Sequence, residues 1–365
     1  MKTSNMLARL SLVALALFAP VSRACDECDD VESASRLAGR SVASLHARQD
    51  LGNIFPVKEY PDQQVKNVTK YLAEARNLAD EDLYAHFSHR CILNQVYPEL
   101  SSLAQSAGLI RPAEIFKNVF FVGTTAVSAW AIDTGKGLLI IDTLNNAAEA
   151  EGIIIRGLES LGYSGEDIKW VLITHEHGDH FNGGRWLQDT YDPAFIASEA
   201  AWDGMSGNER APVRNEKSIA VKEGQKVKFG NVQFTFHITP GHTPGTTSFF
   251  FPVIDHQDGT KHTVRFFGGL GLPRTAATQS TQISSLERFS KLAKKTGADV
   301  LMANHQLQDR SMYHFEILAH RECRGKKCNM PNPFVVGRGA LSRYFRVQGL
   351  CVRTYAARLG LSLSV

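Results

Sequence analysis

The sequence predicts an α/β protein with two halves, each of which places a run of strands before helices. Short apolar segments rich in Val, Ile and Phe are separated by Gly, Thr and Lys, which is typical of buried strands. Longer segments between them carry apolar residues three and four positions apart, which predicts amphipathic helices. At 365 residues and 43% hydrophobic composition, the chain can bury one large core or two modest ones.

Residues 1–24 have the features of a secretory signal peptide. Lys2 and Arg9 precede an apolar run, Leu10–Ala19, and Ala24 suits cleavage by signal peptidase. The run is shorter than the roughly 18 apolar residues of a membrane span, and an uncleaved anchor is the alternative interpretation. We therefore expect a secreted protein, extracellular or periplasmic, that has no membrane contact once the leader is removed.

Cleavage would leave a chain with no formal net charge. Three of the 40 basic residues lie in the leader and none of the 37 acidic ones does, so 37 of each sign remain. Because a nucleic-acid-binding protein needs a basic surface, we expect no nucleic-acid partner and predict a small-molecule substrate. The arginines and lysines after Asp309 are predicted to form solvated faces of terminal helices. The sequence gives no prediction of oligomeric state.

In an exported chain the cysteines can form disulfides, and one asparagine can be glycosylated. All six cysteines follow the leader, and an even number in an exported chain predicts disulfides. From local spacing and compartment we predict the pairs Cys323–Cys328 and Cys91–Cys351. Cys25 and Cys28 could form a redox or metal pair, but no thioredoxin-like strand and helix surround them. Asn67 begins the only glycosylation sequon, which matters only in a eukaryotic host.

Residues 25–111 are predicted to form a helical extension outside the catalytic domain. Apolar spacing predicts helices over Val65–Leu78 and Asp82–Ile92. His86 and His89 lie three apart on the second helix and could be metal ligands, but surface or core histidines are the better interpretation. We assign no chemistry to this extension.

Residues 112–332 are predicted to form the catalytic domain, and residues 333–365 a helical tail packed on it. Asn146 and Glu149 have the spacing of a helix cap. In Val232–Ile238, His237 belongs to the polar face of an alternating strand, and we assign it no role. The predicted elements are a hairpin meander from near Val119, a helix from Asn146 to Leu161, strands Trp170–Thr174 and Ala194–Ala197, a helix around Trp186, a hairpin of Ile219–Phe229 and Val232–Ile238, strands Ser248–Val253, Val264–Phe267 and Val300–Ala303, and a helix Ser284–Lys295.

The stretch Val171–Gly184 holds a dense group of metal-binding side chains. His175 and His177 follow a predicted strand and can point the same way, because side chains repeat every second residue on extended backbone. Asp179 and His180 follow the bend at Gly178. Imidazole and carboxylate suit zinc and, less specifically, iron, manganese or cobalt. A polar loop with coincidental histidines is the alternative.

Two more histidines stand at similar places. Pro240 and Gly241 end a strand directly before His242, and His305 follows the last predicted strand. Loops at strand ends are where binding residues concentrate. We therefore treat both as candidate ligands.

The motif HEHGDH resembles the HxHxDH signature of the metallo-β-lactamase superfamily. Further similar pieces follow the same order: Asp142 in GLLIIDT, His242 in TPGHTPG, His305 in LMANHQ, and NPFVVGR near the carboxyl end. The resemblance extends over Phe116–Tyr344. It implies a four-layer αβ/βα sandwich, here with a helical extension at the amino end.

The resemblance also implies a ligand set for two zinc ions per chain. His175, His177 and His242 would hold one metal. Asp179, His180 and His305 would hold the other, and Asp179 is the ligand to which we also assign a catalytic role. Asp142 would orient a ligand imidazole, with a turn residue at a strand end as the alternative. Such a pair would attack a carbonyl with a metal-bound hydroxide and needs no serine or cysteine nucleophile.

One departure from the family pattern is informative. Many hydrolytic relatives, including glyoxalase-type thioesterases and lactonases, have a metal-bridging aspartate at the position of RFFGGLGLP. Here Gly268 and Gly269 stand in its place, and no cysteine does. Five histidines and one aspartate are similar to the third lactamase subclass.

The predicted function is that of a secreted dinuclear zinc hydrolase acting on an amide, lactam, lactone or ester. The alternatives are a sulfur dioxygenase with a single iron, a thioesterase or lactonase of a specialised metabolite, and a non-catalytic metal-binding protein. Trp202, Met205 and Phe181 are our candidates for the pocket lining.

Overall fold

Two β-sheets packed against each other position every other element. The computed structural model describes residues 62–97 and 110–365. The predicted signal peptide, residues 1–24, lies outside the described residues, and so do Cys25 and Cys28. Phe121, Trp130 and Leu172 of one sheet pack with phenylalanines of the other in a single buried cluster. This cluster is the central core.

The first sheet holds seven strands in sequence order. Neighbours from the first to the fourth run antiparallel, and neighbours from the fourth to the seventh run parallel. The strands are β1 (Ala113–Phe116), β2 (Val119–Phe121), β3 (Trp130–Asp133), β4 (Leu138–Ile141), β5 (Ile168–Leu172), β6 (Ala194–Ser198) and β7 (Ile219–Val221).

The second sheet has the order β12-β11-β10-β9-β8. Its neighbours are antiparallel except β11 and β12, which are parallel. The strands are β8 (Lys226–Phe229), β9 (Val232–Ile238), β10 (Thr247–Ile254), β11 (Lys261–Phe266) and β12 (Val300–Met302), and a separate two-stranded hairpin contains β13 (Cys323–Arg324) and β14 (Lys327–Cys328).

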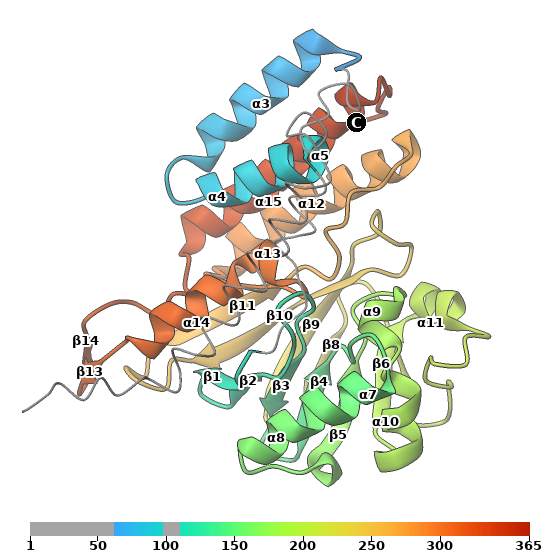
Figure 1. Ribbon diagram of the computed structural model, residues 1–365, viewed down its shortest axis with the longest axis vertical. Helices are drawn as coiled ribbons and strands as arrows, with labels where there is room; N and C mark the ends of the chain where they lie inside the picture. Colours follow the sequence, from blue (N-terminus) through green and yellow to red (C-terminus); the bar gives the residue numbers. More distant parts are fainter. Residues whose placement is uncertain (1–61, 98–109) are drawn as a thin grey trace, which may run out of the picture. The chain divides into compact units, whose positions relative to one another are not determined.

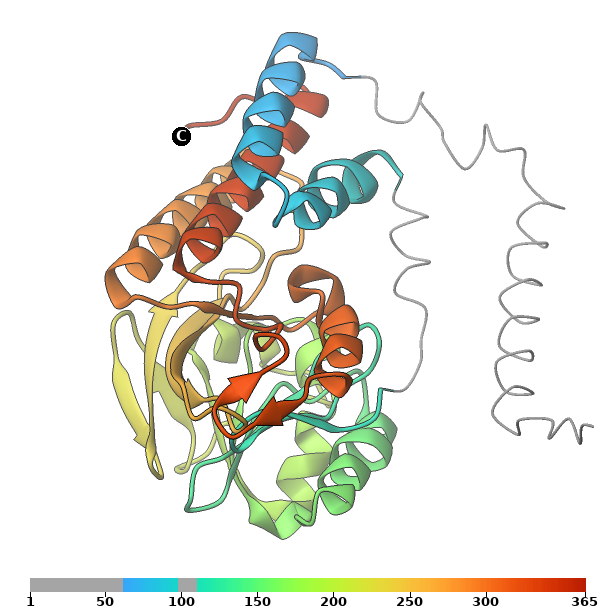
Figure 2. The same cartoon turned by 90° about the vertical axis from the view of Figure 1, so that its left-hand side faces the viewer.

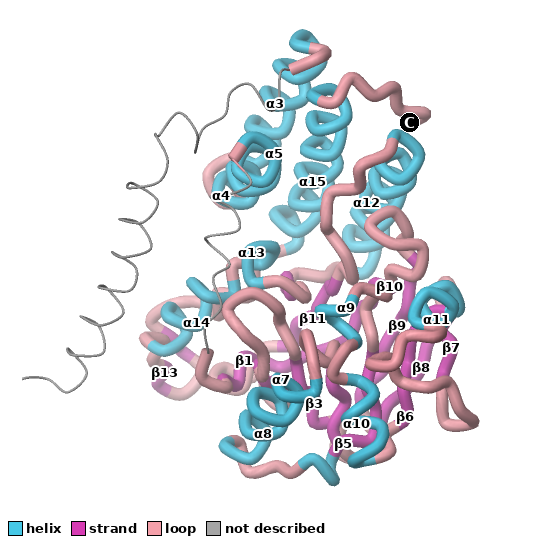
Figure 3. Tube along the Cα trace, turned by 45° about the vertical axis from the view of Figure 1, so that its right-hand side comes forward, coloured by secondary structure: helices cyan, strands magenta, loops and turns pink. Residues whose placement is uncertain are grey.

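Helices cover the outer face of each sheet (Figures 1 and 3). The first sheet is covered by α7 (Ala147–Glu149), η2 (Ala150–Ile155), α8 (Arg156–Ser160) and α10 (Gly184–Tyr191), and the second by α12 (Ala276–Thr296) and α15 (Arg338–Arg358). The shorter helices are η3 (Gly165–Asp167), α9 (Gly178–Phe181), α11 (Glu199–Met205), α13 (Gln306–Asp309) and α14 (Ser311–Ala319).

Strand β4 shows why the sheets lie inside. Its side chains alternate in direction, so Leu139 and Ile141 enter the core between the sheets while Leu138 and Ile140 pack under the helices. A strand buried on both faces needs an unbroken apolar sequence, which this one has. The predicted four-layer αβ/βα sandwich is confirmed.

The amino-terminal helices pack on the carboxyl-terminal helix (Figure 2). They are α3 (Val65–Ala79), α4 (Tyr84–Phe87), the π-helix η1 (Ser88–Leu93) and α5 (Asn94–Val96). Both predicted disulfides are present, and Cys91–Cys351 joins η1 to α15. Gln95 strengthens this junction, because its amide nitrogen donates to the carbonyls of Arg90 and Cys351.

Several predicted elements are correct, and the cap at Asn146 is among them. Its side chain accepts a hydrogen bond from the backbone of Glu149. The predicted strand Ile219–Phe229 is wrong, because it is two strands in different sheets. The chain turns at Gly224, which has a positive φ of 72°. Helix α12 starts eight residues before the predicted Ser284, with Thr275 as its cap.

Two predictions of solvent exposure are also wrong. His237 is buried rather than on an open polar face, because α12 covers that side of β9 and brings the Phe289 ring against it. In the basic tail, Arg321 is buried in an ion pair with Asp255, and Arg358 pairs with Asp62. The alternation of polar and apolar residues within one segment does not show which other element packs over it.

Asn67 lies exposed on α3, where its amide donates to the Gln64 side chain. Its glycosylation stays a prediction. Within residues 62–97 and 110–365, no helix is both long enough and apolar enough to cross a bilayer.

We expect the Cys91–Cys351 disulfide to contribute far more stability than Cys323–Cys328. It closes a loop with a sequence separation of 260 residues instead of 5, and cross-linking restricts the unfolded chain more for longer loops. Replacing both cysteines of the long-range pair by serine should lower the free energy of unfolding by about 3–5 kcal/mol, against about 2 kcal/mol or less for the local pair. Denaturant unfolding of both double variants measures the difference, and equal losses would contradict it.

Candidate metal centre

All six predicted ligands follow the ends of strands. His175, His177 and the helix α9 come after β5, His242 comes after β9, and His305 comes after β12. Gly183 allows the first loop to fold closely, since a Cβ there would lie 2.2 Å from the Thr143 carbonyl oxygen. The Thr143 backbone in turn donates to the carbonyl of His180.

The structure brings the six side chains together as two groups of three. His175, His177 and His242 form the first group. Asp179, His180 and His305 form the second. Within each group the ligand atoms lie within 4.8 Å of one another. These are the groups that the sequence resemblance implies.

The spacing of the donor atoms fits a tetrahedral metal ion. Ligands about 2.0–2.1 Å from zinc lie about 3.3 Å from each other. Nε2 of His180 lies 3.1 Å from Oδ2 of Asp179 and 3.2 Å from Nε2 of His305, and the third side of this triangle is 3.5 Å. The residues present therefore fit the metal that the fold implies.

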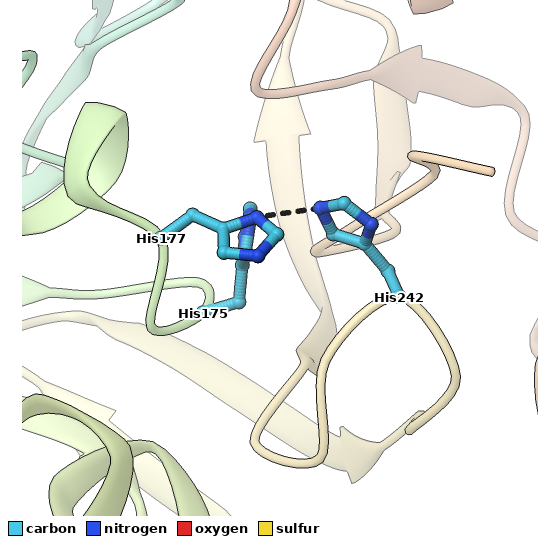
Figure 4. A group of neighbouring side chains, drawn as sticks. All are labelled: His175, His177 and His242. Carbon is cyan, nitrogen blue, oxygen red and sulfur yellow. Dashed lines mark hydrogen bonds between the residues drawn. The ribbon is translucent and has the colours of Figure 1, made fainter. Parts of the chain in front are cut away.

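The first group spans the gap between the two sheets. Figure 4 shows the imidazoles of His175 and His177 facing that of His242, and the dashed line joins ring nitrogens. Nε2 of His175 and Nε2 of His242 are 3.1 Å apart. His175 is buried, whereas His177 is exposed, so the group opens to one side.

In the second group, buried acceptors fix the ring orientations. Nδ1 of His180 lies 2.8 Å from Oδ2 of Asp142, and Nδ1 of His305 lies 3.1 Å from the carbonyl oxygen of Ala126. A proton held on Nδ1 leaves Nε2 as the lone-pair donor for a metal. Asp142 thus has the contact proposed for it, and its carboxylate also accepts from the backbone and hydroxyl of Thr174.

Burial and neighbouring charges shift the pKa values of His180 and of the first-group histidines His175 and His242 in opposite directions. Burial, followed by the nearby imidazoles, lowers the pKa of His242 to about 3 and that of His175 well below its usual value. Burial opposes charge on His180 as well, but Asp142 and Asp179 outweigh it and raise the pKa of His180 to about 10. Without metal, the first group is neutral and the second carries a proton.

A glycine loop encloses the His242 ring. A Cβ on Gly271 would lie 2.0 Å from Cε1 of His242, and one on Gly269 would lie 2.7 Å from Cδ2. A Cβ on Gly268 would meet the Thr247 carbonyl at 2.0 Å. A side chain at Gly268 therefore cannot be added without moving the backbone, and one at Gly269 would displace the His242 ring.

Sequence reasoning missed Glu176, the residue between the first two histidines. Its carboxylate accepts from the Gly245 backbone and from the Thr243 hydroxyl. These bonds tie the first ligand loop to the loop that carries His242. The available signal was an acid inside the motif that is not itself a ligand.

A cavity of about 330 Å³ lies over both groups. The candidate lining residues Trp202, Met205 and Phe181 are wrong, because all three are buried in the core under the first sheet. The helical extension, to which the sequence analysis assigns no chemistry, contributes His86, His89, Arg90 and Asn94 to the cavity wall. Among the described residues, the cavity is lined by His86, His89, Arg90, Asn94, His177, Asp179, His242, Leu270, Gly271, Leu272, His305, Leu307, Gln308, Tyr344 and Gln348.

The model of the metallo-beta-lactamase superfamily matches residues 122–253, which contain Asp142 and five of the six candidate ligands. Residues 122–253 therefore match a domain of the metallo-beta-lactamase superfamily. His305 lies beyond the matched residues, as do α12, α15 and the amino-terminal helices.

Solved metallo-beta-lactamases share the fold of this domain. FEZ-1 from Legionella gormanii is 21% identical with a TM-score of 0.55, and the match covers 66% of this chain and 93% of that one. BJP-1 of Bradyrhizobium japonicum, described as a subclass B3 metallo-beta-lactamase, is 26% identical with a TM-score of 0.55 and covers 67% and 93%. The structural match to the third lactamase subclass agrees with the resemblance found in the sequence.

Several curated relatives of this region are named as hydrolases. The probable metallo-hydrolase YybB of Bacillus subtilis is 28% identical over 134 residues, covering 35% of this chain and 57% of that protein. A hydroxyacylglutathione hydrolase of Bdellovibrio bacteriovorus is 28% identical over 167 residues, covering 43% and 56%. The chain therefore spans little more than half the length of these relatives.

We expect zinc binding at the second group, and not at the first, to depend on pH. The pKa of His180 is raised to about 10, so a metal must displace a proton there at neutral pH. Zinc affinity at this position should rise about tenfold per pH unit between about pH 7 and pH 9, while the first position stays nearly constant. Calorimetric titration in buffers of different ionisation enthalpy counts the released protons.

The matched variant for this experiment is Asp142→Asn. The amide removes the charge that raises the pKa of His180, so proton release at the second position should fall. Proton release that is unchanged by this substitution would show that Asp142 does not control His180.

Proposed function

We propose that this chain is a metal-dependent hydrolase that uses two zinc ions to cleave amide, lactam, lactone or ester bonds of a small molecule. The observation that carries the proposal is a pair of adjacent three-ligand groups at the floor of a cavity. Three protein ligands leave positions open on each metal, as in catalytic rather than structural zinc sites.

Zinc, when bound, makes water more acidic and polarises a carbonyl oxygen. The protein's own part is to hold the ligands and the water. Asp142 and the Ala126 carbonyl fix the rings of His180 and His305. Asp179 lines the cavity, and its hydrogen bond with His180 outweighs burial and lowers its pKa, so it stays anionic. Its carboxylate can therefore accept a hydrogen bond from the attacking water and orient it.

The cavity holds no serine, threonine or cysteine nucleophile among the described residues that line it. Direct attack by water is thus favoured over a covalent intermediate with the protein.

Thioester hydrolysis is a second candidate, favoured by the similarity to hydroxyacylglutathione hydrolases. The ligand set argues for the lactamase-like alternative, because Gly268 and Gly269 occupy the place of the bridging aspartate and pack too closely to accept one.

We also propose that the protein is exported. Two disulfides support this, since such bonds persist in oxidising compartments.

A hydrolysis screen of β-lactams, lactones and thioesters, with and without a chelator, tests the function. We expect turnover with at least one class, its loss on chelation, and recovery with zinc. Metal analysis of the purified protein should give close to two zinc ions. A single iron would instead favour the sulfur dioxygenase alternative, and turnover that survives complete metal removal would contradict the proposal.

Ligand variants should separate metal binding from folding. His175→Ala should remove the first metal and Asp179→Asn should weaken the second, because an amide is a poorer ligand than a carboxylate. Each should lower the rate at least about 100-fold while changing the unfolding midpoint little, since these side chains lie at loop ends. His256→Ala, an exposed histidine outside both groups, is the control. Full zinc content and rate in His242→Ala or His305→Ala would refute the ligand assignment.

A further inference from the structure

The wall of the cavity opposite the metal ligands comes from the two ends of the chain. His89 and Arg90 lie on η1, Asn94 begins α5, and Tyr344 and Gln348 lie on α15. None of these elements belongs to the residues matched by the superfamily model. We call these five residues the roof. The substrate must fit between the roof and the ligand groups.

Arg90 is the cation of the roof, and it is buried. Only 5% of its surface is exposed, yet its side chain borders the cavity. Burial lowers its pKa to about 10, so it remains charged at neutral pH. A buried charge is costly unless a partner compensates it.

The described residues give Arg90 little compensation. Its Nε has no hydrogen-bond partner among them, and one terminal nitrogen lies 3.5 Å from Oε1 of Gln282. Within residues 62–97 and 110–365, no acidic side chain forms an ion pair with it. The Tyr344 hydroxyl, a polar group of α15 in the roof, donates to the Gln308 carbonyl instead.

Arg265 shows how this fold buries a guanidinium that has a structural role. It too has no acidic partner, but its charge lies 3.7 Å from the centre of the Phe345 ring and 4.3 Å from that of Phe289. Such cation–π contacts compensate a buried charge. Arg265 does not line the cavity, whereas Arg90 does and has no comparable ring contact among the described residues.

The backbone beneath Arg90 is held firmly. Cys91, the next residue, is bonded to Cys351, and Gln95 donates to the Arg90 carbonyl. Gln282 continues the support, because its amide donates to the Gly271 carbonyl beside His242. The backbone of Arg90 is thus tied to α15 and α5, and Gln282 connects its guanidinium to the glycine loop. A preorganised cation loses little entropy when an anion binds.

We propose that Arg90 binds a carboxylate of the substrate and selects acidic over neutral substrates. The planar guanidinium matches a carboxylate with two parallel hydrogen bonds. A cavity of about 330 Å³ is at the small end of ligand sites, which limits the substrate to a small acid. This inference rests on the proposed hydrolase function, since the bond to be cleaved must reach the metal ligands while the carboxylate meets the roof.

A pair of chromogenic esters tests the selection. The acidic member is the para-nitrophenyl monoester of adipic acid, and the neutral member is the same ester with its free carboxylate methylated. Arg90→Ala should lower kcat/KM for the acidic ester about 10- to 100-fold, mostly through KM, and change that for the neutral ester less than about threefold. Arg90→Lys should restore part of the loss. Arg346→Ala removes an exposed arginine of α15 outside the cavity and should change neither.

Binding of an unreactive acid tests Arg90 without hydrolysis. Ligand-observed NMR compares phenylacetate with phenylacetamide on the purified, zinc-loaded protein. Arg90→Ala should weaken phenylacetate binding at least about tenfold and leave phenylacetamide unaffected. Equal effects on the acid and the neutral partner in either experiment, or no effect on the acid, would overturn the proposal. If neither ester nor any class in the hydrolysis screen is cleaved but phenylacetate binding depends on Arg90, the hydrolase function fails and the carboxylate site stands.

Discussion

Both ligand groups depend on the buried carboxylate of Asp142. It accepts two hydrogen bonds from Thr174 and lies 2.8 Å from Nδ1 of His180, so it joins the end of β4 to the end of β5 and to the second group. Thr174 also places its hydroxyl 3.2 Å from Nδ1 of His175, in the first group. One anion, fully excluded from water, therefore sets the orientation of imidazoles in both groups. In such surroundings its hydrogen bonds are stronger than at a surface.

The layers and the ligand loops could be predicted because their signals are local. An apolar run such as that of β4 specifies a strand buried on both faces without knowledge of its neighbours. The six ligands were found because each lies on a loop or short helix that follows a strand, and strand ends gather at the edges of sheets. His237 shows the limit of this reasoning. Its alternation is correct, but the helix that buries it lies about fifty residues later in the sequence.

The roof could not be predicted, because nothing local distinguishes it. His86, His89 and Arg90 have ordinary helical spacing, and their position over the ligands is decided by packing between α3 and α15. The glycine loop around His242 could be predicted in part. The family resemblance implies that an aspartate is missing, but only the contacts of Gly268 with the Thr247 carbonyl and of Gly269 with the His242 ring explain why no side chain fits there. The close packing of the glycine loop therefore both excludes the aspartate and encloses the His242 ring.

The disulfide between Cys91 and Cys351 makes the cavity a product of the whole chain. The first sheet and its ligand loop are complete by Val221, but the roof cannot close until α15 is synthesised. Contacts so distant in sequence form late, since a long loop must first be closed. The metal ligands can therefore assemble before substrate selectivity exists. Formation of the Cys91–Cys351 bond then ties η1 to α15 and so secures the roof over the ligand groups.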